Sequence, residues 1–216
     1  QGLCEPKYKT GHDRNFWIWE PYEPGKNYVL VADVARGDGK DFSAFQVFET
    51  DTMTQVAEYQ GKPTLDVYSE MIFEASREYG FCLTVVENNS IGMTVLDKLR
   101  ESKHPNVYFS IKHSHAYIDM YEAENSTRAV PGVTMSSKSR PLIIAKFEEF
   151  IRTKLIRIKS QRLANEMKTF IWNNGRAEAM RGYNDDLVMA CAISCWIRDI
   201  ALVANKREME YKMAFA

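Results

Sequence analysis

The residues YVLVADVA (28–35) decide the fold, because they form a nearly continuous apolar run of strand length. Such a run suits a strand that is buried on both faces of a sheet. The polar, glycine-rich turn RGDGKD (36–41) follows it. Two further apolar stretches, 42–49 and 54–59, are separated by a polar turn around Asp51. This pattern predicts an antiparallel meander of three strands.

Downstream of the meander, helical and strand patterns alternate. Residues 64–79 and 91–101 have apolar side chains at helical spacing, while 81–86 and 107–111 are short apolar strands. An order of strand, helix, strand, helix, strand is typical of an α/β layer with parallel strands. We therefore expect an α/β fold whose central mixed sheet has five or more strands and is flanked by helices.

The second half of the chain adds helices and one hairpin. Residues 112–137 show no periodic pattern, and a loop of that length in a compact domain is usually functional. The turn signal Asn174-Gly175 lies between two stretches of strand character and predicts an added β-hairpin. Helices are expected at 141–152, at 161–167 and, largely buried, at 185–203.

Composition and charge exclude little beyond the extremes. The chain has 216 residues, of which 45% are hydrophobic and 26% charged, so collagen, a coiled coil and wholesale disorder are excluded. Its 28 basic and 29 acidic residues nearly balance, so the whole-chain charge indicates no partner. The apolar run 187–197 is far shorter than the roughly 20 residues of a membrane span. Gly39-Lys40 is followed by Asp41 rather than Ser or Thr, so it is not a nucleotide-binding P-loop.

Three acidic sites stand out by their location. Asp33 lies inside an apolar strand, Glu87 ends another, and Asp185 and Asp186 open the apolar last helix. A carboxylate in such surroundings is unfavourable unless a cation compensates its charge. If the first and fourth strands are neighbours, all three sites can converge at one edge of the sheet. Converging carboxylates suit Mg²⁺ or Mn²⁺, and two such ions can hydrolyse a phosphodiester.

Each carboxylate also has an ordinary structural explanation. Asp33 alone fits a turn residue, and Glu87 fits a cap of the next helix. Asp185 and Asp186 fit a helix N-terminus by capping and by the helix dipole. Asp41 fits a plain loop carboxylate. Only a shared metal requires that they lie together.

The segment 138–168 is basic in an otherwise balanced chain. It holds nine basic and three acidic residues, a net charge of 9 − 3 = +6. Such a stretch is a candidate footprint for a phosphate backbone, and its alternative is a solvated helical face. The candidate DNA-contacting residues are Arg128 in the long loop and Lys138, Arg140, Lys146, Lys154, Arg157, Lys159 and Arg162.

Three stretches in combination are similar to a known family. They are EPGKNYVLVADVARGDGKDFSAFQVFETDT (23–52), VVENNSIG (85–92) and RGYNDDLVMACAISCW (181–196). Together they resemble the C-terminal nuclease domain of tailed-phage terminase large subunits, the DNA-packaging motor proteins, in the form found in contractile-tailed phages. The resemblance covers roughly residues 17–204. It implies a ribonuclease H-like fold and a Mg²⁺- or Mn²⁺-dependent endonuclease that cuts concatemeric viral DNA.

The resemblance also implies roles for particular residues. Asp33, Glu87 and Asp186 match the catalytic, metal-binding carboxylates. Asp185 is the alternative to Asp186, since the acidic pair of the family is adjacent, and Asp41 matches an auxiliary metal-binding carboxylate.

The family further implies an organisation and a setting. Residues 1–26 would be a lead-in from an ATPase domain, 27–204 the nuclease domain, and 205–216 a C-terminal tail. The implied partners are double-stranded DNA, the ATPase domain, the portal and the small terminase subunit, with no membrane. The implied location is the host cytoplasm during virus assembly, transiently at the procapsid portal and not in the mature virion.

Two other functions stay open at this point. One is a DNA-gripping or portal-docking module whose carboxylates are structural and need not converge. The other is a nuclease like the Holliday-junction resolvases, which would prefer branched DNA and form a stable dimer.

Overall fold

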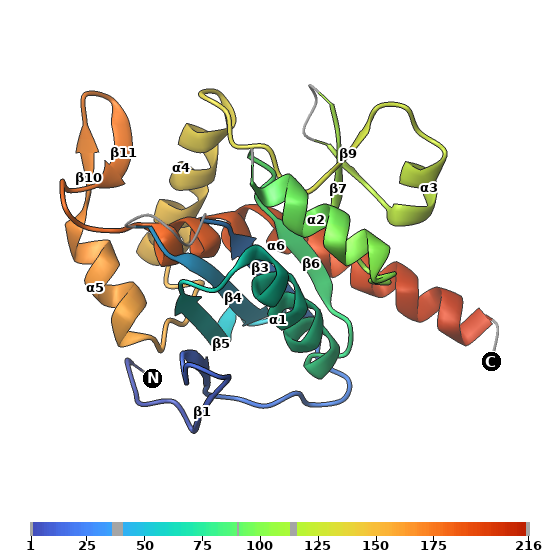
Figure 1. Cartoon of the computed structure of the whole chain (residues 1–216), viewed down its shortest axis with the longest axis horizontal. Coiled ribbons are helices and arrows are strands. Elements are labelled where there is room, and N and C mark those ends of the chain that lie inside the picture. Colours follow the sequence, from blue (N-terminus) through green and yellow to red (C-terminus); the bar gives the residue numbers. More distant parts are fainter. Residues whose placement is uncertain (1, 36–40, 90, 113–115, 215–216) are drawn as a thin grey trace.

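A six-stranded mixed sheet forms the centre of the molecule, and helices flank it (Figure 1). The computed structural model describes residues 2–35, 41–89, 91–112 and 116–214, and the side chains of the last range up to residue 203. The α/β fold with a mixed sheet of at least five strands is confirmed. Across the sheet the strands follow the order β1 (Tyr8–Thr10), β2 (Phe16–Ile18), β5 (Thr54–Gly61), β4 (Ser43–Glu49), β3 (Tyr28–Asp33) and β6 (Leu83–Val86).

Strand β3 is the centre of this arrangement. It pairs antiparallel with β4, which pairs antiparallel with β5, so the predicted meander is confirmed. Its other neighbour, β6, is parallel to it and follows β4, β5 and α1 along the chain, so the crossover back to β3 passes through helix α1. The first and fourth predicted strands are therefore adjacent, as the convergence of Asp33 and Glu87 requires.

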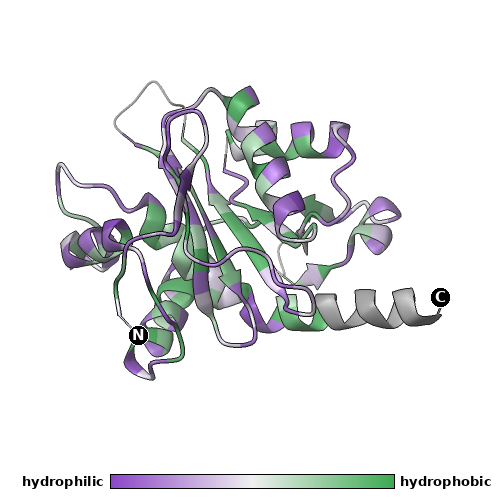
Figure 2. Ribbon diagram, turned by 90° about the horizontal axis from the view of Figure 1, so that it is seen from below, coloured by the Kyte–Doolittle hydropathy of each residue, from purple (hydrophilic) through white to green (hydrophobic). Residues whose placement is uncertain are grey.

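The two faces of β3 belong to different cores. Side chains alternate along a strand, so Val29 and Val31 pack among residues of one pair of helices, and Leu30 and Ala32 pack among residues of another pair. The central strands and the adjoining turns of the last helix are among the hydrophobic parts of the ribbon in Figure 2. The first pair is α4 (Ser139–Arg152) and α6 (Asp186–Ala214), and the second is α1 (Leu65–Glu78) and α2 (Gly92–Glu101).

The segment 112–137 is not the unstructured loop that the sequence predicted. It contains β8 (Tyr117–Ile118), α3 (Met120–Glu124) and β9 (Ala129–Pro131), and β8 and β9 pair with β7 (Phe109–Ile111) in a separate small sheet. The expected fifth strand of the main sheet is thus displaced into this second sheet. It meets β6 only through the isolated bridge between Val107 and Thr84.

Backbone contacts fasten the small sheet to the end of β6. The N–H of Val133 donates to the carbonyl of Val86 at 2.9 Å, and the N–H of Asn88 donates to the carbonyl of Val133 at 3.0 Å. Gly132 has φ +77°, and a Cβ there would lie 2.3 Å from the Val86 carbonyl oxygen. Only glycine fits this approach, which places residues 131–133 directly beside Glu87.

The remaining elements follow the sequence more closely. Helix α5 (Gln161–Thr169) leads into the hairpin of β10 (Phe170–Asn173) and β11 (Arg176–Ala179), which confirms the turn at Asn174-Gly175. The last helix is longer than predicted, since α6 continues to Ala214. The described part of the lead-in, residues 2–26, contributes β1 and β2 to the sheet, because β2 pairs with β5. Within the described residues, no helix combines the length and the hydrophobicity that crossing a membrane requires.

Candidate active site

The register of β3 and β6 brings Asp33 and Glu87 to the same edge and the same face of the sheet. Ala32 is paired with Val86, and the N–H of Glu87 donates to the Ala32 carbonyl at 2.9 Å. Asp33 follows Val31, and Glu87 follows Val85, by two residues each. Since both valines pack in the core formed with α4 and α6, both carboxyl groups point to the side of the sheet that α6 covers.

The Asp33 and Glu87 carboxyl groups interact directly. Burial raises the pKa of Asp33 well above its ordinary value, and the charges of Glu87, Asp186 and Asp185 raise it further. Burial also raises the pKa of Glu87, but a side-chain hydrogen bond with Asp33 and the positive charge of Arg140 oppose that shift. These directions are those of two carboxyl groups that are buried beside each other.

Asp186 reaches the same place from the first turn of α6. Its side chain is buried, and its Oδ2 accepts a hydrogen bond from the N–H of Phe42 at 3.2 Å. Burial raises the pKa of Asp186 to about 7, and Asp185 and Asp41 raise it as well, while the Phe42 bond lowers it. The structure therefore brings Asp33, Glu87 and Asp186 within electrostatic reach of one another.

The two adjacent aspartates have different surroundings. Asp185 Oδ2 accepts from Nη2 of Arg140 at 3.2 Å, and its side chain is partly exposed. Nε and Nη2 of Arg140 also donate to the carbonyl of Ala177 in β11, at 3.3 and 3.0 Å. Asp185 is thus paired with an arginine, whereas Asp186 faces other carboxylates. This difference favours Asp186 as the direct ligand of a cation.

Asp41 lies at the margin of the site. It is exposed, and its charge acts on Asp186. The rest of the glycine-rich turn, residues 36–40, lies outside the described residues.

Sequence analysis did not identify Glu166. Its Oε2 accepts from the N–H groups of Leu187 and Val188 at 2.9 and 3.1 Å, and Nε2 of Gln60 donates to its Oε1 at 2.6 Å. It thereby caps α6 next to Asp186, and burial, with Asp186 adding to it, raises its pKa to about 8. No local pattern marks this residue, because its role arises from packing of α5 against α6.

The donor set suits a hard divalent cation. Asp33, Glu87 and Asp186 offer only carboxylate oxygens, which Mg²⁺ and Mn²⁺ prefer. A cation would also relieve the mutual repulsion that raises their pKa values. In the described part of the chain, however, no three His, Cys, Asp or Glu side chains already stand close enough together to hold a metal ion.

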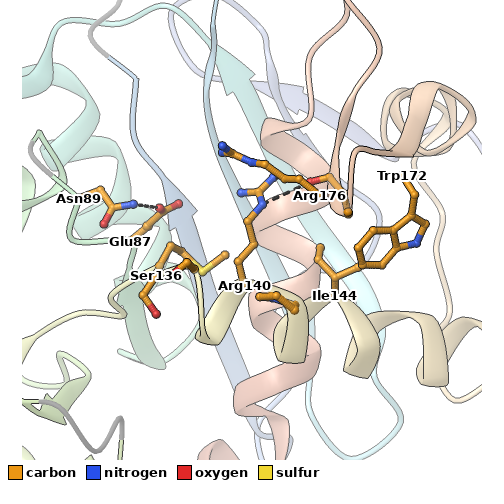
Figure 3. Close-up of a pocket in the computed structure, with 12 residues that line it drawn as sticks. Glu87, Asn89, Ser136, Arg140, Ile144, Trp172 and Arg176 are labelled. Carbon is orange, nitrogen blue, oxygen red and sulfur yellow. Dashed lines mark hydrogen bonds between the residues drawn. The ribbon is translucent and has the colours of Figure 1, made fainter.

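A groove opens directly beside Glu87 (Figure 3). It has a volume of about 370 Å³ and runs from Glu87 past the start of α4 to the β10–β11 hairpin. Arg140 and Arg176 lie in its middle, and Trp172 lies at the hairpin end.

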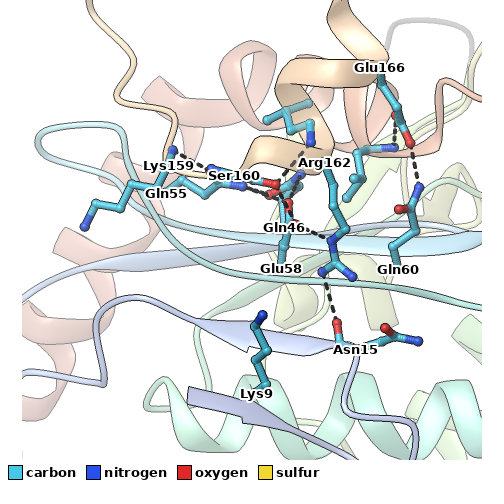
Figure 4. Close-up of polar contacts among 12 residues, drawn as sticks. Lys9, Asn15, Gln46, Gln55, Glu58, Gln60, Lys159, Ser160, Arg162 and Glu166 are labelled. Carbon is cyan, nitrogen blue, oxygen red and sulfur yellow. Dashed lines mark hydrogen bonds and ion pairs between the residues drawn. The ribbon is translucent and has the colours of Figure 1, made fainter. Parts of the chain in front are cut away.

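The predicted DNA-contacting residues do not form one surface. Lys159 is buried and forms an ion pair with Glu20, and Arg162 forms an ion pair with the fully buried Glu58 at 2.8 Å (Figure 4). Arg162 also lies over the ring of Trp17, 3.6 Å from its centroid. These two side chains connect the sheet to α5 and to the residues just before it. Both are therefore structural and are no longer candidates for DNA contact.

The other basic candidates differ in their exposure and in whether they form an ion pair. Lys146 is half-buried and pairs with Glu149 at 3.1 Å. Four side chains are exposed: Arg128, Lys138, Lys154 and Arg157.

No family model matches the chain. Among solved structures, it is similar to the large terminase nuclease of thermophilic phage G20c with bound magnesium, with a TM-score of 0.67 and 16% identity over 90% of this chain and 92% of that one. The cobalt-bound form of the same nuclease gives a TM-score of 0.66 at 16% identity, over 90% and 92% of the two chains. The nuclease domain of the Thermus phage P74-26 large terminase gives 0.65 at 17% identity, over 89% and 88%.

The chain has the fold of a large terminase nuclease. The ribonuclease H-like fold expected from the sequence is thus confirmed, over nearly the full length of both chains. Because the identities lie between 16% and 17%, these structures establish the fold alone.

Proposed function

We propose that this chain is the nuclease domain of a phage terminase large subunit, and that it hydrolyses phosphodiester bonds of concatemeric viral DNA during genome packaging. The observation that carries the proposal is the meeting of Asp33, Glu87 and Asp186 at one edge of the sheet, within a terminase nuclease fold. Terminase nucleases of this fold have been observed with bound magnesium and cobalt.

Asp33, Glu87 and Asp186 would hold one or two Mg²⁺ or Mn²⁺ ions, with Asp185 and Asp41 beside them. A bound divalent metal lowers the pKa of a coordinated water and neutralises charge on a scissile phosphate. The chain's own part is to hold these oxygens in place. Phe42 orients Asp186, Glu166 fixes the first turn of α6, and Arg140 neutralises Asp185 through an ion pair.

DNA binding would rest on charge rather than on base contacts. Arg128, Lys138, Arg140, Lys154 and Arg157 remain the candidate phosphate contacts, with Lys146 available if its pair with Glu149 opens. Phosphate contacts carry no sequence information, so we expect little sequence preference and an affinity that falls steeply with salt.

The setting follows from the same proposal. The partners would be double-stranded DNA, an ATPase domain connected through residues 1–26, the portal and the small terminase subunit. Residues 27–204 would form the nuclease domain, to whose sheet the lead-in adds β1 and β2, and 205–216 would be its tail. The parent virus would be a contractile-tailed phage. The protein would act in the host cytoplasm, transiently at the procapsid portal, and would be absent from the mature virion.

A docking module would not need its carboxylates to converge. The placement of Glu87 and Asp186 near Asp33 at one edge of the sheet therefore favours the nuclease over a DNA-gripping or portal-docking module. A resolvase would be revealed by preferential cutting of four-way junctions.

Cleavage of supercoiled plasmid tests the proposal. Wild-type protein should nick and linearise it with Mg²⁺ or Mn²⁺ but not with EDTA, and Asp33→Ala and Asp186→Ala should abolish cutting while still binding DNA. Asp97→Ala, at an exposed acid of α2, should cut like wild type. Cutting that survives either active-site substitution would refute the assignment, and a folded wild-type protein that cuts under no metal condition would favour the docking module.

A further inference from the structure

The groove beside Glu87 has three chemically distinct parts. At one end is the Glu87 carboxylate, in the middle are the guanidinium groups of Arg140 and Arg176, and at the other end the indole of Trp172 lies near Ile144 (Figure 3). This order matches three consecutive parts of a DNA strand. The scissile phosphate would lie at the acidic end, the next phosphate at the two arginines, and a base against the apolar wall.

Trp172 is the unusual member of this set. Its side chain is 60% exposed, although an indole of this size is normally packed in a core. Its hairpin forms a separate two-stranded sheet, so no third strand covers the indole. Exposed aromatic rings that line a basic groove are the stacking platforms on which proteins hold unpaired bases.

The arginines supply the electrostatic part. Arg140 is held by Ala177 and Asp185, and its five donors allow these bonds and a phosphate contact at the same time. Arg176 is 67% exposed, and its contact with Glu178 is long, at 3.7 Å. Guanidinium groups match the geometry of phosphate oxygens, so two of them beside a candidate cleavage site favour a phosphate between them.

The size of the groove limits what can enter. Its volume of about 370 Å³ is at the small end of the range of ligand sites, roughly 300–1,000 Å³. That is room for one nucleotide and not for a base-paired duplex. Resting on the proposed function, we propose that this groove binds a single unpaired nucleotide next to the scissile phosphate, with its phosphate on Arg140 and Arg176 and its base stacked on Trp172.

The proposal has a consequence for the substrate. A nuclease with such a subsite requires one strand to leave the duplex at the cut. It should therefore cut DNA that is locally melted faster than the same sequence when it is fully paired.

Binding is tested without cleavage, in EDTA, with an oligothymidine of about eight nucleotides, the scale of one strand-binding site. The oligonucleotide should quench tryptophan fluorescence of the wild type, and the quenching should disappear in Trp172→Phe. Trp172→Ala should weaken binding by roughly 5-fold or more, and Trp172→Tyr should retain it. Arg176→Ala should weaken binding and reduce its salt dependence by about one ion.

Ile171→Ala is the matched control, because Ile171 is on the same strand but points to the opposite face of the hairpin and does not line the groove. It should bind like wild type. Quenching that persists unchanged in Trp172→Phe, or equal affinities of folded Trp172→Ala and Ile171→Ala, would overturn the proposal.

Cleavage of a duplex with a short central bubble, compared with its fully paired form, separates this proposal from the function itself. Preferential cutting of the bubble that is lost in Trp172→Ala supports the subsite. Equal cutting of both substrates by wild type and Trp172→Ala overturns the subsite and leaves the nuclease standing. If wild type cuts neither but binds the oligonucleotide through Trp172, the proposed nuclease fails and the strand-binding groove stands.

Discussion

The carboxyl groups of Asp33 and Glu87 lie beside each other at one edge of the sheet because Ala32 and Val86 are partners in the parallel register of β3 and β6. Each acid is one residue beyond the end of this pairing, on the face that α6 covers. Two carboxyl groups in such contact cannot both be ionised without a compensating charge. The sheet therefore holds them in an arrangement that is unfavourable for the protein alone and favourable for a bound cation.

Replacing Asp33 with Asn should reveal this conflict. Asparagine does not ionise and so avoids the cost of burying an acid beside other carboxylates, and metal-free Asp33→Asn should melt a few degrees higher than metal-free wild type, at about 2–4 °C per kcal/mol. Mg²⁺ should raise the Tm of wild type and leave that of Asp33→Asn almost unchanged, since ligand binding stabilises the state that binds. Thermal melting in EDTA measures the difference between the metal-free proteins, and melting in Mg²⁺ measures the shift that the ion causes. Asp97→Asn is the control. An equal Mg²⁺ shift in all three proteins would show that Asp33 does not bind the ion.

Gly92, at the start of α2, should be essential for the position of Glu87. A Cβ on Gly92 would lie 1.7 Å from the Glu87 carbonyl oxygen, so Gly92→Ala must push the end of β6 away from α2. We expect a loss of about 2 kcal/mol of stability despite the better helix propensity of alanine, together with loss of cleavage. Denaturant unfolding measures the first effect. Thr94→Ala, at an exposed position of the same helix, is the control and should leave the free energy of unfolding unchanged. If Gly92→Ala is as stable as wild type, the close packing of Gly92 on Glu87 is wrong.

Arg162 should matter for stability and not for DNA. Its guanidinium neutralises Glu58, which is fully buried and also accepts from Ser160. Arg162→Ala should therefore destabilise the fold by about 3–5 kcal/mol, because it leaves a buried carboxylate without its cation. The double variant Arg162→Ala with Glu58→Gln should regain part of that loss. At a temperature where Arg162→Ala is still folded, its DNA affinity should equal that of wild type, and a clear loss of affinity would return Arg162 to the DNA-contacting set.

The contribution of His104 to stability should fall below pH 6.5, while the raised pKa values of Asp186 and Glu166 act in the opposite direction. Burial lowers its pKa from 6.5 to about 4, and its Nδ1 accepts from the N–H of Asn106, which requires the neutral ring. Between those two pH values, His104 is protonated in the unfolded chain but stays neutral in the folded chain. The stabilising contribution is thus complete above pH 6.5 and declines as the pH falls to 4, by at most roughly 3 kcal/mol.

Urea unfolding of wild type and His104→Gln at pH 7, 5.5 and 4.5 isolates this contribution, because Asp186 and Glu166 titrate alike in both proteins. The stability advantage of wild type over His104→Gln should shrink as the pH falls, whereas its difference from His12→Gln, at an exposed histidine, should stay constant. If the two variants keep the same slope as wild type, another group is responsible for the acid sensitivity.

The sequence was informative where a local pattern controls the structure. The apolar run 28–35 and the strand at 81–86 were enough to predict two buried strands that end in Asp33 and Glu87. That the two strands are adjacent was a condition of the metal-site hypothesis, and the structure meets it. The hairpin turn at 174–175 followed from two residues with positive φ, which Asn and Gly accept most readily.

The sequence failed where partners come from distant elements. Lys159 and Arg162 read as part of a basic surface, but a sequence shows charges without showing the buried Glu58 or Glu20 that pair with them. The small sheet within 112–137 escaped notice because its strands are only two or three residues long and depend on the contact of Gly132 with Val86. Glu166 was invisible for the same reason, since its partners are the backbone N–H groups of Leu187 and Val188 in another helix.

The measurement that tests the central claim most directly is anomalous X-ray diffraction from crystals of the wild-type chain grown with Mn²⁺. The account predicts one or two manganese peaks bound by oxygens of Asp33, Glu87 and Asp186, and none at that position in Asp33→Asn crystals. Manganese bound elsewhere, with these three carboxylates uncoordinated in a protein that still cuts DNA, would contradict it.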